Sequence, residues 1–327
     1  MLILDTKKLQ NKKNLLAFSA GVDSSALFYL LLENNINFDI AIVDYGLREE
    51  SKKEINHAKT LAKRHKLFCH DIKAPKYETH FEKKARDFRY EFFESLISIE
   101  GYDNLLTAHQ LNDQLEWLFM RFTKGAGASE LIGLEPLIQK ENYILLRPLL
   151  SYTKEELLSY LKENDYPYFI DESNDDEKYE RNKFRKRFSD ALMSEYSEGI
   201  KRSFDYLRND KTILESNFES LYTHKSLQIV KLHNLKMKTK AVDIALKQLG
   251  YLLSASQRQE IEKENSLVIG GEWAIEIQDD LLYLCPYVTV GMTKEFKEKC
   301  RVYKVPNKIR PYIFKENIEP SFLIPNS

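Results

Sequence analysis

The chain has 327 residues, of which 43% are hydrophobic and 30% charged, and its formal net charge is −1. This composition is typical of a globular protein, and no apolar run approaches the length of a membrane span. The three cysteines, Cys69, Cys285 and Cys300, are far apart and form no C-x-x-C pair, which argues against a disulfide framework or a zinc cluster. Residues 1–5 lack the features of a secretory signal. We therefore expect a cytoplasmic protein with reduced thiols and no membrane partner.

A short apolar run at residues 15–18 leads into a loop of small and polar residues, and a longer apolar run with a helical pattern follows it. The first run predicts a buried strand and the second a helix, which Asp23, Ser24 or Ser25 is suited to cap. The N-terminus of a helix offers free backbone N–H groups that bind phosphate. Gly21 permits a positive φ or the close approach of an anion. The turn is therefore a phosphate-binding loop or an ordinary connection between strand and helix.

Four further apolar runs predict strands, and the segments between them have helical patterns. The strands are expected at residues 38–45, 67–72, 105–108 and 144–148, and the helices at 50–66, 80–99 and 113–123. This alternation predicts an α/β fold with a doubly wound parallel sheet. Ligands bind such sheets at the carboxyl ends of the strands. Three polar clusters, at 19–24, 44–48 and 109–113, follow predicted strands and are expected to converge at that edge.

The middle of the chain carries an excess of positive charge. Residues 178–240 contain 15 Lys and Arg against 8 Asp and Glu, so the remainder of the chain is net acidic. Five of the seven residues at 181–187 are basic, and an acidic, turn-like stretch at 171–177 precedes them. A basic segment between acidic ones indicates a surface for a polyanion, although a solvated helical face is the commoner meaning of such an excess.

A helix is predicted to begin after Thr153, which can form a capping box with Glu156, and helical patterns continue to about residue 221. The last hundred residues differ in pattern from this helical region. Beyond it, helices are predicted at 240–250 and 255–264, and a β-hairpin is predicted from 267–277 and 281–284. The expected divisions are a first domain at 1–187, a helical connector at 188–221 and a smaller α+β domain at 222–327.

The loop Ser19-Ala20-Gly21-Val22-Asp23-Ser24 resembles the PP-loop of the ATP pyrophosphatases, usually written SGGxDS, which holds the pyrophosphate of ATP. Ala20 stands where the second glycine is usual. We expect the loop to tolerate the added methyl group with a negative φ at this position. No Gly-Lys-Ser/Thr follows, so the loop is not a Walker A loop.

Behind the PP-loop, seven sequence elements occur in the same order as in the tRNA(Ile)-lysidine synthetase family, which the chain resembles over residues 15–187. They lie at 43–48, 85–90, 109–117, 120–127, 147–150, 171–174 and 181–185. The chain departs from the family pattern at Tyr45, Gln110, Asn112 and Trp117, where His, a second His, Asp and Thr are usual. His109, Asp113 and Glu116 match the pattern.

The resemblance implies an adenine nucleotide alpha hydrolase-like PP-loop domain, a C-terminal tRNA-binding domain and an ATP-dependent ligase. ATP would adenylate the carbon-2 oxygen of the wobble cytidine in a tRNA(Ile) with a CAU anticodon, and pyrophosphate would leave. The side-chain amine of free lysine would then attack carbon 2, releasing AMP and leaving lysidine, which switches codon reading from AUG to AUA. The implied cofactors and partners are ATP, Mg²⁺, this tRNA and L-lysine, and the resemblance also allows a homodimer.

The resemblance also implies roles for individual residues. The ATP-binding residues are expected to be Ser19, Ala20, Gly21, Val22, Asp23, Ser24 and Ser25. Asp23, His109, Asp113 and Arg86 are expected to be catalytic, with Asp23 and Asp113 as Mg²⁺ ligands. Asp44, Asp113 and Glu116 are the expected partners of the lysine cation. The tRNA is expected to contact Arg89, Arg121, Lys124, Arg181, Lys183, Arg185, Lys186 and Arg187, and an anticodon base to stack on Tyr45, Phe88 or Trp117.

Two other functions fit parts of the pattern. Other PP-loop enzymes, such as tRNA thiolases, use cysteine pairs or a nucleophilic cysteine, whereas only Cys69 lies in the first domain, in a predicted strand. A non-catalytic adenine-nucleotide-binding module would not require His109, Asp113 or the basic segment. The fragment 109–116 taken alone is better explained by a helix-capping Asp113 and a surface histidine, so the assignment depends on the ordered elements together.

Overall fold

The structure is a computed structural model that describes residues 2–46, 50–77, 79, 81–170 and 180–323. The chain divides into two compact units, Met1–Arg208 and Asn209–Ser327. Their boundary falls within the segment expected to be a helical connector, and each unit has its own sheet and core. Within the described ranges, no helix is long and apolar enough to cross a membrane.

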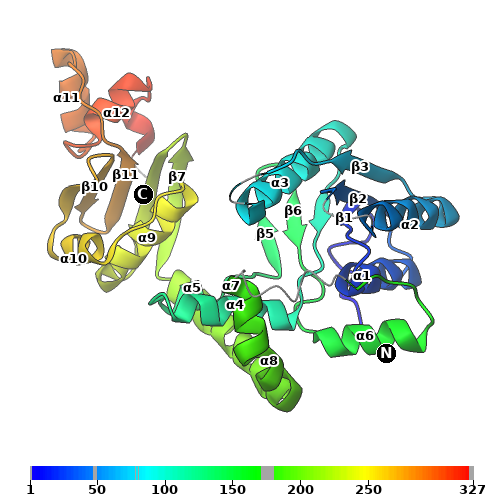
Figure 1. Ribbon diagram of the computed structural model, residues 1–327. Coiled ribbons are helices and arrows are strands. Elements are labelled where there is room, and N and C mark those ends of the chain that lie inside the picture. The colour runs from blue at the N-terminus through cyan, green and yellow to red at the C-terminus, as the bar shows by residue number, and fades with distance from the viewer. Residues whose placement is uncertain (1, 47–49, 78, 80, 171–179, 324–327) are drawn as a thin grey trace. The chain divides into compact units, whose positions relative to one another are not determined.

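The first unit is built on a six-stranded sheet with the strand order β3-β2-β1-β4-β6-β5 (Figure 1). All neighbouring strands are parallel except β5, which pairs with β6 in the antiparallel direction. The strands span Asn14–Ala17 (β1), Phe38–Asp44 (β2), Cys69–Lys73 (β3), Asn104–Leu106 (β4), Leu137–Gln139 (β5) and Ile144–Leu146 (β6). The predicted parallel sheet is confirmed, and β5 is an edge strand that the sequence analysis did not predict.

The strand order reverses between β1 and β4. The chain runs outward from β1 through β2 to β3 and then returns to place β4 on the other side of β1. The connections that leave β1 and β4 therefore diverge, and the carboxyl ends of strands beside such a switch point are where ligands of these sheets bind. The loop after β1 is the PP-loop, and the loop after β4 carries Thr107 and His109. The topology thus brings two of the predicted polar clusters to one place.

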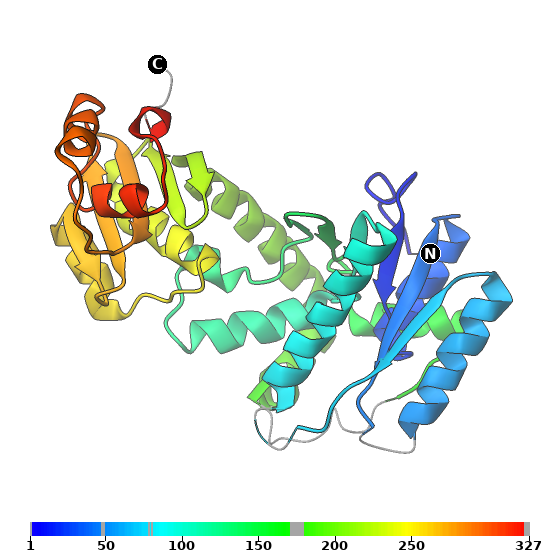
Figure 2. The ribbon, with the colours of Figure 1, turned by 90° about the horizontal axis from the view of Figure 1, so that it is seen from above.

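Helices cover both faces of this sheet because successive strand residues point to opposite sides. Leu16 and Ile40 pack into one core with α1, α2 and α6, whereas Leu15 and Ala41 pack into a second core with α3. Figure 2 shows α3 on one side of the strands and α2 on the other. These helices span Val22–Glu33 (α1), Glu50–His65 (α2), Phe81–Glu100 (α3) and Lys154–Glu163 (α6).

A second group of helices in this unit packs on its own small core. This core joins α4 and α8 through Leu111, Leu115, Met193 and Phe204. The group comprises α4 (Leu111–Phe122), the short α5 (Ala128–Leu131), α7 (Glu180–Phe184), a π-helical turn at Arg185–Ser189 called η2, and α8 (Asp190–Glu215). Single π-helical turns are rare and frequently occur at functional sites.

The second unit contains a five-stranded antiparallel sheet with the order β7-β8-β11-β10-β9. One face packs against α9 and α10 through Val242, Leu246 and Ile261, and the other packs against α11 and α12 through Cys300 and Ile313. The strands span Phe218–His224 (β7), Leu227–Leu232 (β8), Ser266–Ile269 (β9), Trp273–Gln278 (β10) and Leu281–Pro286 (β11). The helices span Lys238–Gln248 (α9), Ala255–Lys263 (α10), Lys294–Val302 (α11) and Arg310–Lys315 (α12).

Two local predictions in this region are wrong. The helical pattern was expected to continue to residue 221, but α8 ends at Glu215 and β7 begins at Phe218. Ser216 and Asn217 end the helix by donating side-chain hydrogen bonds to the carbonyl of Ile213, at 2.8 and 3.0 Å. The predicted β-hairpin is present as β10 and β11, but the stretch 267–277 is two strands, β9 and β10, separated by a turn at Gly270 and Gly271, both with positive φ.

Candidate active site

The PP-loop connects β1 to α1 and is held by contacts among its own residues. Ser24 Oγ accepts a hydrogen bond from the backbone N–H of Ser19 at 3.2 Å and donates to the carbonyl of Gly21, also at 3.2 Å. The hydroxyls of Ser19 and Ser24 are 3.0 Å apart. Capping of α1 by Asp23, Ser24 or Ser25 was expected and is wrong, because Gly21 is the N-cap and no side chain caps the helix. The N-terminus of α1 therefore retains uncapped N–H groups of the kind that bind phosphate.

Ala20 has a φ of +60°, so the predicted negative φ is wrong. A residue with a Cβ pays about 1 kcal/mol for this left-handed conformation, which glycine adopts freely. The methyl group of Ala20 is fully buried in the core shared with α1, and its carbonyl accepts from the N–H of Phe169 at 2.9 Å. The loop thus keeps the backbone of a glycine-containing PP-loop, and burial of the methyl group offsets part of the strain.

Asp23 lies in the first turn of α1, and its Oδ1 atom is buried without a hydrogen-bond partner in the described part of the chain. Burial, reinforced by the negative charge of Asp113, raises the pKa of Asp23 to about 7, although Lys154, Arg185 and Arg181 act in the opposite direction. A buried carboxylate oxygen without a donor is suited to receive a cation that arrives with a ligand.

His109 follows β4 and lies before α4, which begins at Leu111. His109 and Asp113 therefore do not lie on one face of a helix. His109 Nδ1 is 3.0 Å from Thr107 Oγ1. Burial and the positive charges of nearby arginines, with Arg147 the strongest, lower the pKa of His109 to about 3. The imidazole is therefore neutral at physiological pH, with one nitrogen turned to Thr107.

Asp113 serves as a helix cap and as the partner of an arginine. Its Oδ2 accepts from the backbone N–H of the N-cap residue Gln110 at 2.9 Å, which completes a capping box. Its Oδ1 accepts from a terminal nitrogen of Arg181. Both carboxylate oxygens are therefore occupied in this conformation, so Asp113 offers Mg²⁺ less than Asp23 does.

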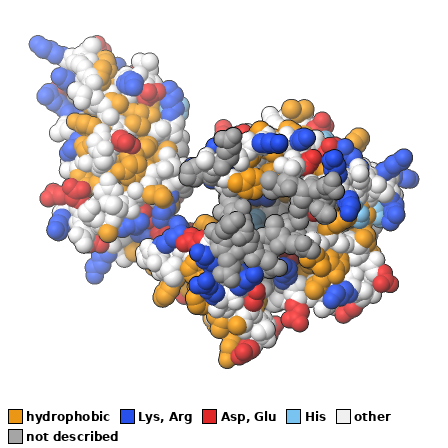
Figure 3. Space-filling view, in the orientation of Figure 1, with side chains coloured by type: hydrophobic (Ala, Val, Ile, Leu, Met, Phe, Trp, Pro, Cys, Tyr) orange, Lys and Arg blue, Asp and Glu red, His pale blue; other side chains and the backbone are white. Residues whose placement is uncertain are grey.

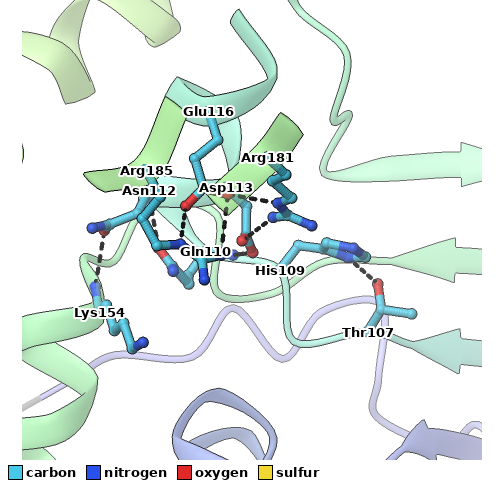
Figure 4. A network of polar contacts seen from close by, with 9 residues as sticks. All are labelled: Thr107, His109, Gln110, Asn112, Asp113, Glu116, Lys154, Arg181 and Arg185. Atoms are coloured by element: carbon cyan, nitrogen blue, oxygen red, sulfur yellow. Dashed lines mark hydrogen bonds and ion pairs between the residues drawn. The ribbon is translucent and has the colours of Figure 1, made fainter. Parts of the chain in front are cut away.

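Glu116 is fully buried and receives two guanidinium groups (Figure 4). Arg181 Nε donates to its Oε2 and Arg185 Nε to its Oε1, each at 2.6 Å. Arg181 also contacts Asp113, so two arginines neutralise two carboxylates in one network. Arg181 and Arg185 were expected to contact tRNA, and Asp113 and Glu116 to bind lysine. In the structure these four side chains contact one another, and their roles toward tRNA and lysine remain predictions.

The other basic residues expected to contact RNA or phosphate lie around this network. The guanidinium of Arg86 is exposed and lies 4.9 Å from the centre of the Tyr90 ring, while Arg89 is half-buried. Both raise the positive potential at His109. Arg121 lies 5.2 Å from the ring of Trp117 and Lys124 pairs with Glu180 at 2.7 Å. The exposed residues of the basic segment are Lys183, Lys186 and Arg187.

The carboxyl end of β2 supplies the third predicted cluster. Asp44 Oδ1 accepts from the N–H of Gly46 at 2.8 Å. The hydroxyl of Tyr45 donates to the carbonyl of Ala85 at 3.3 Å. Residues 47–48 and 171–174, which belong to two of the sequence elements, lie outside the described residues.

Trp117 and Phe88 complete the aromatic side chains expected to stack on a base. The indole of Trp117 lies against the backbone of Gly133, where an added Cβ would be 1.6 Å from Nε1, and Nε1 donates to the carbonyl of Glu130 at 3.4 Å. Phe88 is half-buried on α3. Trp117 is therefore packed against the loop around α5, and base stacking on any of the three remains a prediction.

Arg147 and Lys154 are two site residues to which the sequence analysis gave no role. Arg147 is buried, donates to the carbonyl of Glu135 at 2.7 Å and is the arginine with the strongest effect on His109. Lys154 begins α6, and its backbone N–H donates to Asn112 Oδ1 at 3.1 Å. Both residues follow the carboxyl end of β6. The rule that ligands bind at the carboxyl ends of parallel strands located the other clusters and would have indicated these two residues as well.

Comparison with known proteins gives concordant matches. Residues 3–192 match the PP-loop domain family. The chain is 45% identical to the tRNA(Ile)-lysidine synthase of Campylobacter jejuni over 96% of both chains. It is 40% identical to that of Wolinella succinogenes, covering 96% of this chain and 97% of the relative, and 41% identical to that of Helicobacter pylori, covering 94% and 91%.

Among solved structures, the chain is similar to the U34-tRNA thiolase NcsA from Methanococcus maripaludis, which is described with its [4Fe-4S] cluster. The match has a TM-score of 0.51 and 18% sequence identity and covers 63% of this chain and 72% of the thiolase. At this level of identity the likeness shows a shared fold only.

Proposed function

The chain belongs to the tRNA(Ile)-lysidine synthase family of PP-loop proteins, and we propose on this basis that it uses ATP to join lysine to the wobble cytidine of a tRNA(Ile) with a CAU anticodon. The observation that carries the proposal is the 45% identity to a relative over 96% of both chains, which spans both structural units. The topology agrees with it, since a PP-loop and a neutral histidine flank the same switch point between β1 and β4.

The PP-loop binds the phosphates of ATP. The uncapped N-terminus of α1 and the hydroxyls of Ser19 and Ser24 supply donors where negative charge grows as pyrophosphate leaves. Ser25 is fully buried, and its hydroxyl has no partner among the described residues. This end of the loop thus holds the leaving group while the tRNA base is adenylated.

Asp23 fits a Mg²⁺ ion that enters with ATP. Magnesium is usually held by one or two carboxylates together with substrate phosphates, and Asp23 offers a buried oxygen without a donor beside the phosphate-binding turn. Bound there, the ion would neutralise charge on the phosphates. Asp113 takes part as a second ligand only when Arg181 has released it.

Lysine needs a site whose acidic side chains bind its ammonium group. The side-chain amine that reacts must be neutral when it attacks. Asp44, Asp113 and Glu116 remain the proposed partners, and Arg181 and Arg185 compete for two of them. Neutral His109 is suited to accept a hydrogen bond from the attacking amine and so to orient it, because its unprotonated form dominates at physiological pH. A pKa this low makes His109 a weak base, so the proton of the amine passes to solvent or to a carboxylate. The surrounding arginines, Arg86 and Arg89 among them, stabilise the negative charge of the adenylated intermediate.

The tRNA backbone is expected to contact the exposed part of the basic segment. Lys183, Lys186 and Arg187 face solvent on α7 and η2, next to Lys124 on the adjacent loop. Binding through these residues would weaken with salt as counterions are released. The homodimer that the family resemblance allows would be tested by the mass of the protein in solution.

A thiolase is disfavoured by the chemistry of the cysteines. Cys69 is the sole cysteine of the first unit, lies on β3, and has its pKa raised to about 11 by burial. The thiolate, the reactive form, is therefore scarce at neutral pH. The described ranges also contain no group of three or more His, Cys, Asp or Glu side chains that could hold a metal ion.

The proposal is tested by release of pyrophosphate from ATP in reactions that omit lysine or tRNA in turn. We expect release to require the tRNA(Ile) with a CAU anticodon and to be weak with an elongator tRNA(Met) transcript. ATP binding without turnover under any combination would favour the non-catalytic module instead.

A further inference from the structure

A pocket of about 430 Å³ opens on α7 and η2, and the proposed function gives no role to its aromatic residues. Its described lining consists of Glu180, Lys183, Phe184, Arg187 and Phe188. Phe184 and Phe188 are four residues apart, as are Lys183 and Arg187, so each pair lies along one side of the helix. The described lining thus combines two aromatic rings and two cations with one carboxylate.

The aromatic wall consists of Phe184 and Phe188, whose ring centres are 5.7 Å apart. The ring of Phe188 also lies 6.1 Å from that of Phe119, yet 49% of the Phe188 residue surface is exposed. Neither Phe184 nor Phe188 belongs to the buried cluster that joins α4 to α8. The two rings therefore leave apolar surface exposed without contributing to that core. A flat ligand would cover this surface.

The charged wall favours an anion. Among the described lining residues, Lys183 and Arg187 lie beside one acidic residue, Glu180, whose carboxylate is paired with Lys124 at 2.7 Å. Figure 3 shows Lys and Arg side chains gathered over the region that Figure 1 labels α4 and α7. Flat rings combined with cations are the means by which proteins bind unpaired nucleotides, whose bases stack while the phosphates are neutralised.

The pocket shares its helix with the active-site network. Arg181 and Arg185 extend from the same turns of α7 and η2 to Asp113 and Glu116. Lys183, Phe184 and Arg187 lie between or directly after them in the sequence. A nucleotide bound in the pocket would therefore be close to the site where a neighbouring base reacts.

We propose that Phe184 and Phe188 form a stacking platform for an unpaired anticodon-loop nucleotide adjacent to the modified cytidine, and that Lys183 and Arg187 bind its phosphate. The inference rests on the proposed function. It adds a base-stacking subsite to the contacts with the RNA backbone, and it gives a common role to the aromatic and cationic residues that line the pocket.

The first test is equilibrium binding of a CAU anticodon stem-loop to variants of the full-length protein at several salt concentrations. The double variant Phe184→Leu/Phe188→Leu keeps the apolar surface and removes the rings, so affinity is expected to fall about 5- to 150-fold at an unchanged salt slope. The variant Phe184→Tyr/Phe188→Tyr keeps the rings and is expected to bind within about threefold of the wild type. Lys183→Ala/Arg187→Ala, which removes the contacts with one phosphate, is expected to flatten the salt slope by about 0.7.

Phe68→Leu provides the matched control, because Phe68 is an exposed phenylalanine of the same unit located before β3, at the opposite end of the strands. It is expected to bind RNA as the wild type does. Leucine variants of Phe184 and Phe188 that also bind like the wild type would overturn the platform. Equal binding by leucine and tyrosine variants, both weaker than wild type, would likewise assign the residues to packing rather than stacking.

A second test locates the nucleotide directly. The photo-crosslinking residue p-benzoylphenylalanine at position 188 is expected to join an anticodon-loop nucleotide, whereas a crosslink to another arm of the tRNA or to the protein itself would contradict the proposal. Lysidine formation by the wild-type protein distinguishes failure of the stacking platform from failure of the proposed function. If the wild type modifies tRNA while the leucine variants bind and react normally, the stacking platform fails and the proposed function stands. If the wild type forms no lysidine, the proposed function fails.

Discussion

The guanidinium of Arg185 donates from Nε to Oε1 of the fully buried Glu116 at 2.6 Å. Arg181 reaches the other oxygen of the same carboxylate and also contacts Asp113. The basic residues of the segment 181–187 therefore fall into two groups. Two of its arginines hold the carboxylates at the start of α4, and its remaining cations face solvent.

Removing the carboxylate of Glu116 is expected to destabilise the first unit. Glu116→Ala would leave Arg181 and Arg185 without their shared partner, at a cost of about 3 kcal/mol in the free energy of unfolding. The measurement is urea unfolding followed by the fluorescence of Trp117 in a Trp273→Phe background. The control is Lys183→Ala, at an exposed position on α7, the helix that carries Arg181. Its free energy of unfolding should stay within about 0.5 kcal/mol of the wild-type value. An equally small effect of Glu116→Ala would show that the network contributes little to folding.

The raised pKa of Asp23 has a definite consequence for stability. In the folded protein this carboxyl titrates at about 7, above its ordinary value of 3.8. The folded state therefore binds more protons than the unfolded state between these values, and this group makes the protein less stable as pH rises through that window. Asp23→Asn should thus stabilise the ligand-free protein at pH 8 by on the order of 4 kcal/mol, and the difference should vanish near pH 4. A pH-independent difference would contradict the burial of an ionisable Asp23.

The same residue should be essential once ATP is bound. Asp23→Asn is expected to abolish pyrophosphate release while leaving the affinity for the tRNA unchanged, because the carboxylate is assigned to Mg²⁺ and ATP rather than to RNA. Ser19→Ala is the companion variant and should retain part of the activity, since backbone N–H groups of the loop remain. Normal turnover by Asp23→Asn would remove this residue from the ATP site.

His109 should affect stability in the opposite pH direction to Asp23. Its pKa is lowered to about 3, below the ordinary value of 6.5, so the unfolded state binds more protons between these values. Its contribution to stability is complete above pH 6.5 and is lost as pH falls toward 3. His109→Gln, which retains a partner for Thr107, should weaken the acid-induced loss of stability. In the wild type, the pH profile of kcat/KM should show no step attributable to His109 between pH 5 and 9, and a histidine step near 6.5 would contradict the assigned neutral state.

Ala20 gives a prediction about the backbone. Ala20→Gly removes the strain of the positive φ but also a buried methyl group and some rigidity, so the net change in stability should stay within about 1 kcal/mol and ATP turnover should be retained. Ala20→Val, which brings a β-branched side chain into a left-handed position, should destabilise by about 2–3 kcal/mol. Equal stability of the valine variant, measured by thermal unfolding, would contradict the conformation at residue 20.

The sequence was sufficient to predict the parts of the fold that depend on local pattern. The apolar runs gave the parallel strands, and the ends of those strands located the clusters around Asp23, Asp44 and His109. The φ of Ala20 could not be inferred, because the cost of a left-handed alanine is local while its compensation comes from burial in a distant core. The inward direction of Arg181 and Arg185 was likewise invisible, since nothing in a run of basic residues identifies those with a buried carboxylate as partner. The β7 strand was missed because its alternation is weak and it follows a 26-residue helix.

The central claim is that this chain attaches lysine to a specific tRNA at the expense of ATP. Its most direct test is mass spectrometry of nucleosides from tRNA(Ile) with a CAU anticodon after incubation with the protein, ATP, Mg²⁺ and lysine. The account predicts one cytidine, at the wobble position, heavier by one lysine less one water. Unchanged cytidine in a reaction with protein that binds ATP, or replacement of oxygen by sulfur in the tRNA, would contradict it.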